Sequence, residues 1–104
     1  MGAGVTMTWV LHLKPEVADA FWSDLKVVAT GTRAFAGCGG ADVFRNRDDS
    51  SEILLVSEWD SYEKYWEYSA WAAANGVRLA GIPVQDVASL LARPSVRQFW
   101  DVRA

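Results

Sequence analysis

The chain has 104 residues, which is enough for one hydrophobic core, so we expect residues 1–104 to form a single domain. Hydrophobic residues make up 51% of the sequence and charged residues 22%, a balance that excludes intrinsic disorder and predicts a packed globular fold. The net charge is -3 and the ten Lys and Arg residues are scattered, which argues against nucleic acid as a partner.

The sequence shows neither a membrane segment nor a secretory leader. Its apolar runs are shorter than the roughly 20 residues that a membrane helix needs, and its N-terminus lacks a basic start followed by an apolar stretch. Cys38 is the single cysteine, so no internal disulfide can form. We therefore expect a cytoplasmic protein that has no membrane partner.

The first half of the chain is predicted to form a strand, a helix and a pair of strands. Branched and aromatic residues predict a strand over 5–13 (VTMTWVLHL), and Lys-Pro then opens a helix over 15–30 that Gly31 caps. Two more strands are predicted at 41–46 and 52–59. The polar turn between them predicts a hairpin.

The second half is predicted to add two helices and a final strand. Ser61 is a typical N-cap and Asn-Gly at 75–76 is a typical stop, so a helix lies between them. Residues 83–91 are predicted to form a short helix ended by Pro94, and 96–102 a last strand. This order of elements predicts an α+β fold of the ferredoxin-like split βαββαβ type, with an extra short helix before the last strand.

Apolar residues occupy both faces of the predicted strands. Residues 53–56 are Ile-Leu-Leu-Val, whereas a strand with one solvated face alternates apolar and polar residues. Trp9 beside Val10, and Phe99 beside Trp100, repeat this pattern. We infer that the second sheet face is buried against a copy of the same chain in a two-fold homodimer.

The sequence offers neither a metal site nor a nucleotide motif. One histidine and one cysteine cannot supply the usual ligands of zinc, copper or haem, and neither GxGxxG nor GxxxxGK[ST] occurs. We expect no cofactor. His12, at the end of the first predicted strand, is either a general base, because imidazole exchanges protons near neutral pH, or a strand-end residue without a catalytic role.

Residues 57–71 (SEWDSYEKYWEYSAW) concentrate six aromatic side chains. A core built only for stability would use Leu, Ile and Val, because each buried Tyr or Trp needs a hydrogen-bond partner. The stretch therefore predicts either an aromatic core or one wall of a pocket for a planar apolar ligand. On the predicted helix, the stripe that we expect to cover the sheet holds Tyr62, Tyr65, Trp66 and Ser69, with Tyr68 and Trp71 beside it.

The segment 54–68 (LLVSEWDSYEKYWEY) resembles the antibiotic biosynthesis monooxygenase family, in which a strand ending in Trp leads through a short polar link into an aromatic helix. Phe-Ala-Gly at 35–37, followed by the strand from residue 41, is similar to a second passage of that family. The resemblance implies a dimeric α/β barrel of ferredoxin-like domains. It also implies a cofactor-independent monooxygenase acting on an aromatic polyketide, quinol or anthrone type of molecule.

The resemblance further implies a set of catalytic residues. Trp59 matches the Trp that ends the family's third strand, Tyr65 matches the Tyr of the next helix, and Arg78 lies near an Arg beyond that helix. We expect these three residues to act with His12 as the base. The family's Asn position holds Leu55, a departure that keeps open the alternative of a non-catalytic dimeric domain that binds a small molecule. A structural dimer with an aromatic core is the third possibility.

We expect the ligand, an aromatic small molecule, to contact side chains from the strands and from the second long helix. These expected ligand-binding residues are Trp9, Phe44, Leu55, Tyr62 and Trp66.

Overall fold

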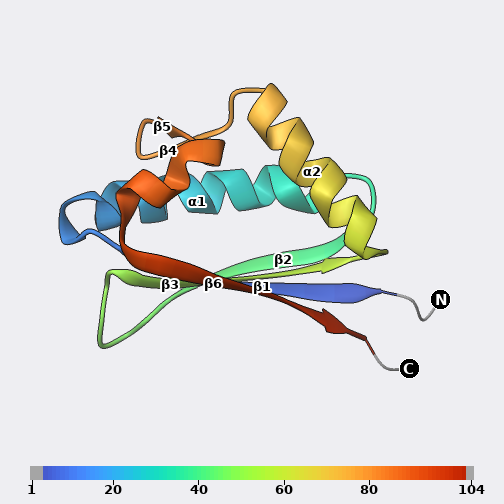
Figure 1. The fold of residues 1–104 in the computed structure, drawn as a ribbon, viewed down its shortest axis with the longest axis horizontal. Coiled ribbons are helices and arrows are strands. Elements are labelled where there is room, and N and C mark those ends of the chain that lie inside the picture. Colours follow the sequence, from blue (N-terminus) through green and yellow to red (C-terminus); the bar gives the residue numbers. More distant parts are fainter. Residues whose placement is uncertain (1–3, 103–104) are drawn as a thin grey trace.

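The computed structural model describes residues 4–102 and shows an antiparallel sheet with two helices packed against one of its faces (Figure 1). The strand order is β2-β3-β1-β6. The sheet strands are β1 Val5–Leu13, β2 Cys38–Arg45, β3 Glu52–Trp59 and β6 Leu91–Asp101, and the helices are α1 Pro15–Arg33 and α2 Tyr62–Ala74. The predicted α+β fold of the split βαββαβ type is confirmed. The dimeric barrel stays a prediction.

The two central strands and α2 follow the pattern of the sequence. β1 and β3 have the predicted bounds, and their inward side chains, such as Leu11 and Ile53, are fully buried. Ser61 caps α2 as predicted, because its Oγ accepts a hydrogen bond from the Lys64 backbone N–H at 3.2 Å. The chain turns away at Gly76, whose φ of 71° is a conformation that glycine adopts without strain.

Two predicted boundaries in the first half are wrong. α1 does not end at Gly31 but continues to Arg33. The side chain of Thr32 is buried and its Oγ1 lies 2.6 Å from the Tyr68 hydroxyl, so tertiary contacts outweigh the roughly 1 kcal/mol by which glycine disfavours a helix. β2 begins at Cys38 rather than at residue 41, because the glycines after Cys38 pair with β3 across an irregular register.

The last strand is also longer than predicted. β6 begins at Leu91 and passes through Pro94, which the sequence suggested as the end of a helix. Proline is tolerated here because β6 lies at the edge of the sheet and its register with β1 shifts between Val10 and His12, beside Pro94. A missing N–H therefore costs little at this position.

A short hairpin and a 3-10 helix connect α2 to β6. β4 Arg78–Leu79 pairs with β5 Ile82–Pro83, and η1 Val84–Leu90 replaces the predicted third helix. The Asp24 carboxylate on α1 accepts a hydrogen bond from the Ala80 N–H at 2.8 Å, which fixes the hairpin to α1. The hairpin was not predicted because strands of two residues are too short to show an alternating pattern.

The core consists of two clusters on the inner face of the sheet. The larger cluster packs the sheet against α1, and its most deeply buried members are Leu11, Leu13, Phe21, Leu25 and Ile53. The smaller cluster lies under α2 and contains Val5, Met7, Trp59 and Tyr65. The aromatic stretch is thus divided between core and surface, because Tyr62, Trp66 and Trp71 are exposed.

Apolar side chains also cross the outer face of the sheet, the face turned away from α1 and α2 (Figure 1). The strand register sets one residue of each sheet strand in a single row, namely Phe44, Leu54, Val10 and Val96. We call these four residues the outer row. About half of the surface of Phe44 and of Val96 is exposed, so the chain as described leaves this row uncovered. No helix within residues 4–102 is long and apolar enough to cross a membrane.

Candidate functional site

A cavity of about 400 Å³ lies between the inner face of the sheet and the helices. This volume falls within the range of about 300–1,000 Å³ that is usual for small-molecule sites. The space exists because small side chains stand where α1 and α2 face the sheet, among them Ala29, Ser69, Ala72 and Ala73. Leucines at those positions would fill the gap.

The floor of the cavity is a row of four side chains on the inner face of the sheet. Strand register sets Val43, Leu55, Trp9 and Arg97 side by side, from β2 at one edge to β6 at the other. Three of these residues are apolar and the fourth carries a positive charge. The floor is therefore polarised, with its cationic end at the β6 edge.

Trp59 and Tyr65 form an aromatic wall of the cavity. They are 3% and 5% exposed, and their rings meet edge to face with centroids 5.7 Å apart. The Trp59 indole Nε1 donates a hydrogen bond to the buried Ser57 hydroxyl at 2.8 Å, so that donor is already satisfied. Within residues 4–102, no hydrogen-bond partner meets the Tyr65 hydroxyl. That hydroxyl can therefore serve a ligand.

Tyr68 also lines the cavity, which the helical pattern did not predict. Its hydroxyl shares the 2.6 Å hydrogen bond with Thr32 of α1, so the two helices are linked above the cavity. The inner face of α2 runs from Tyr65 through Tyr68 to Ala72, whereas Tyr62 lies on the exposed side. The predicted stripe was thus turned by about one residue, and the small size of Ala72 was the signal that could have corrected it.

Burial keeps both inner tyrosines in the neutral form. It raises the pKa of Tyr65, an effect that the nearby Arg97 partly opposes and that Tyr68 reinforces. Burial likewise raises the pKa of Tyr68, although the hydrogen bond with Thr32 works in the other direction. Each phenol is therefore a proton donor near neutral pH.

The two buried phenols are expected to make the fold sensitive to alkali. Because their pKa values are raised in the folded state, the unfolded chain loses these protons first, at the usual tyrosine value of about 10. The free energy of unfolding should therefore fall as the pH rises through about 10. Denaturant titrations between about pH 8 and 11 should show a smaller fall for Tyr65→Phe than for the wild type, and equal falls would contradict this account.

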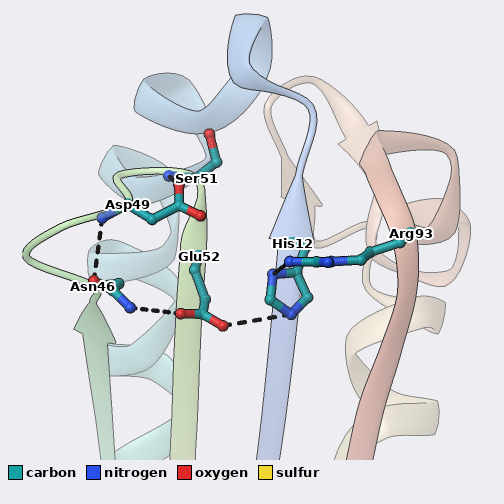
Figure 2. A network of polar contacts seen from close by, with 6 residues as sticks. All are labelled: His12, Asn46, Asp49, Ser51, Glu52 and Arg93. Atoms are coloured by element: carbon teal, nitrogen blue, oxygen red, sulfur yellow. Dashed lines mark hydrogen bonds and ion pairs between the residues drawn. The ribbon is translucent and has the colours of Figure 1, made fainter.

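His12 lies outside the cavity, at one end of the sheet (Figure 2). Its Nδ1 is 3.0 Å from Nη2 of Arg93 and its Nε2 is 3.4 Å from a carboxylate oxygen of Glu52. A guanidinium only donates, so Nδ1 accepts that bond and Nε2 carries the hydrogen toward Glu52. Glu52 is held in turn by the Asn46 amide at 2.6 Å. The imidazole has no free lone pair, and the structure does not support the predicted role of base.

The structure separates the predicted site residues into two groups. Trp9, Leu55, Trp59 and Tyr65 line the cavity. Arg78 does not, because it lies exposed in the β4–β5 hairpin, where its guanidinium donates to the Gly81 carbonyl at 2.8 Å. Phe44 belongs to the outer row, on the opposite face of the sheet. Those outside the cavity are thus His12, Arg78, Phe44, Tyr62 and Trp66.

Arg97 is the cavity residue that sequence reasoning missed. Its guanidinium carbon lies 3.9 Å from the centroid of the Trp9 ring and within cation–π distance of Tyr65 and Trp66, at 5.8 and 5.3 Å. The signal in the sequence was a single basic residue at an inward position of the last strand, two before Phe99. Only a correct β6 register identifies that position as inward.

In the part of the chain that the structure describes, no group of three or more His, Cys, Asp or Glu side chains is placed to hold a metal ion.

The sequence is similar to that of a known family. The family model described as "Antibiotic biosynthesis monooxygenase" matches residues 5–74, which run from β1 through α2 and supply most of the cavity walls. A search of curated proteins found no match.

Several solved structures share the fold. Rv0793 from Mycobacterium tuberculosis is 20% identical with a TM-score of 0.77, and the match covers 98% of this chain and 97% of that chain. PA3566 from Pseudomonas aeruginosa is 18% identical with a TM-score of 0.78, covering 100% and 98%. A mutant of SnoaB, a cofactor-independent oxygenase from Streptomyces nogalater, is 14% identical with a TM-score of 0.71, covering 98% and 95%. At these identities the likeness shows the fold alone.

Proposed function

The chain belongs to the antibiotic biosynthesis monooxygenase family, and we propose on that premise that its cavity binds a planar aromatic phenol, quinol or anthrone and oxidises it with dioxygen, without a cofactor. The observation that carries this proposal is the cavity of about 400 Å³ with Trp9, Trp59, Tyr65 and Tyr68 among its walls. Flat aromatic surfaces with a few polar groups suit a planar, mostly apolar ligand. SnoaB, which shares the fold, is a cofactor-independent oxygenase.

The reaction needs little from the protein beyond a suitable environment. An anthrone-type substrate loses a proton and its anion transfers one electron to dioxygen, after which the two radicals combine at carbon. The resulting peroxide takes up a proton and loses water. The CH₂ group thus becomes C=O, one oxygen atom enters the product and the other leaves as water, so dioxygen is the only oxidant.

The residues of the cavity suit three of these steps. Apolar side chains such as Leu55 limit the water around the radical pair. The neutral Tyr65 hydroxyl, which has no partner within residues 4–102, is placed to donate a proton or a hydrogen bond to the oxygen being reduced. Trp59 holds Tyr65 in place through their edge-to-face contact.

Replacing Tyr65 by Phe is expected to lower the rate of oxygen uptake at least tenfold, because general acid catalysis usually contributes about 10²-fold or more. Trp59→Phe should also slow the reaction, since it removes part of the wall and leaves the Ser57 hydroxyl without its indole donor. The measurement is oxygen consumption with a panel of quinols, anthrones and naphthols. Trp71→Phe, an exposed position on the same helix, is the matched control and should keep the wild-type rate. Unchanged turnover in both cavity variants would refute these roles.

One observation favours a second candidate function, a non-catalytic module that binds the same class of molecule. Leu55 stands in the cavity floor where the family resemblance implies an amide, and no histidine lines the cavity within residues 4–102. Tryptophan fluorescence recorded during the oxygen measurement separates the two candidates. Quenching with oxygen uptake supports the oxygenase, whereas quenching without uptake supports the binding module.

The outer row suits a homodimer, which we include in the proposal. Four apolar side chains in line, with one from each sheet strand, form a flat patch that a second copy can cover by two-fold symmetry. Dimer formation through this face would leave the cavity, on the opposite face, open to ligand.

A further inference from the structure

Arg97 places a positive charge at the cavity without a matching negative charge. Within residues 4–102 its guanidinium forms no ion pair with a carboxylate, and its Nε is buried with no hydrogen-bond acceptor. A charged group removed from water destabilises the fold unless it is paired. The Trp9 ring beneath it, at 3.9 Å, compensates only in part, because a ring face accepts no conventional hydrogen bond from Nε.

A second unsatisfied donor lies directly beside it. The Trp9 indole Nε1 is also buried without an acceptor, and Trp9 and Arg97 are direct partners in the register of β1 and β6. Most buried polar groups in native proteins have a partner, so two neighbouring orphan donors require an explanation. Both residues line the cavity, and a ligand oxygen there can supply the missing acceptor.

The other ionisable groups around the cavity do not neutralise this charge. The side chains that α2 brings close to Arg97 are Tyr65 and Trp66, and Tyr68 lies further along the same helix. Asp42 of β2 also borders the cavity, but it is exposed and its neighbours Ala41 and Val43 are the inward residues of that strand. β2 is moreover at the opposite edge of the sheet from β6, three strand spacings of about 4.8 Å away.

We propose that Arg97 and the Trp9 indole N–H together bind an anionic oxygen of the ligand, so that the cavity selects aromatic molecules in their ionised form, as phenolates or enolates. The proposal rests on the function proposed above and deepens it by naming the charge state of the ligand. Its apolar ring system lies over Trp9 and Leu55, and its oxygen lies at the β6 edge. A cation at this position stabilises the ligand anion and so removes the need for a protein base.

The test uses 2-naphthol under anaerobic conditions, because naphtholate and naphthol differ in absorbance and no turnover is involved. For the wild type we expect the apparent pKa of bound 2-naphthol to lie at least about one unit below that of the free molecule. In Arg97→Gln this shift should disappear and the affinity at neutral pH should fall about ten- to a hundredfold, the factor that a charge-assisted hydrogen bond typically contributes. Arg97→Lys should retain part of the shift, since it keeps the charge.

Arg93→Gln is the matched control, because it removes the same charge from the same strand at an exposed position that pairs with His12 outside the cavity. Its naphthol titration should match that of the wild type. Circular dichroism establishes that each variant is folded. An unshifted pKa in the wild type, absence of naphthol binding, or equal binding by Arg97→Gln and wild type would overturn the proposal. Naphtholate binding without any oxygen uptake from the substrate panel would refute the oxygenase alone.

Discussion

Replacing Phe21 by alanine is expected to lower the free energy of unfolding by about 3–5 kcal/mol, the usual result of deleting a fully buried aromatic ring. Phe21 is 1% exposed and lies in the larger core cluster between α1 and the sheet. Domains of this size are typically stable by only about 5–15 kcal/mol, so the variant should approach the limit of folding. The loss should appear in denaturant titrations as a lower midpoint.

Val27→Ala on the same helix is the control for this prediction. Val27 is 74% exposed, so its replacement should change the free energy of unfolding by no more than about 0.5 kcal/mol. Equal losses in the two variants would mean that α1 does not pack against the sheet through the face that contains Phe21.

Introducing a carboxylate in the outer row is expected to convert the proposed homodimer into a monomer. Leu54 lies on the central strand β3, between Phe44 and Val10 in the row, and Leu54→Asp would put a charge from each copy into the centre of the contact. An unpaired buried charge costs several kcal/mol, so we expect dissociation to become at least about a hundredfold more favourable.

Sedimentation at micromolar concentration measures this effect. The wild type should sediment as a dimer and Leu54→Asp as a monomer with unchanged circular dichroism. Val27→Asp, which places the same charge on an exposed part of α1, should remain dimeric. A wild type that is monomeric under these conditions would contradict the homodimer.

The fold could be predicted where side-chain periodicity and local caps act together. β1 and β3 alternate buried and partly buried residues around long apolar runs, and Ser61 marks the start of α2 through a local hydrogen bond. The errors arose where contacts distant in sequence decide. Thr32 continues α1 past Gly31 because it meets Tyr68, a partner 36 residues away.

The candidate site was predictable only in its aromatic part. Trp59 and Tyr65 follow from the family resemblance and do line the cavity, as does Leu55 in its floor. Arg97 was missed because its importance depends on the register between β1 and β6, which sets it against Trp9. The role given to His12 failed for the opposite reason. A strand-end histidine is a plausible base in sequence, but alternation sends its side chain away from the cavity and toward Arg93.

The central claim is that the space between sheet and helices is a binding site for a planar aromatic molecule. Calorimetric titration of 2-naphthol into Ala73→Phe and Ala74→Phe tests it most directly, because the two positions are adjacent on α2 but only Ala73 lines the cavity. A phenyl ring at position 73 occupies the ligand's space, whereas one at exposed position 74 does not. We predict that Ala73→Phe loses at least about tenfold in affinity while Ala74→Phe binds as the wild type does. Wild-type affinity in both variants, each folded by circular dichroism, would contradict the claim.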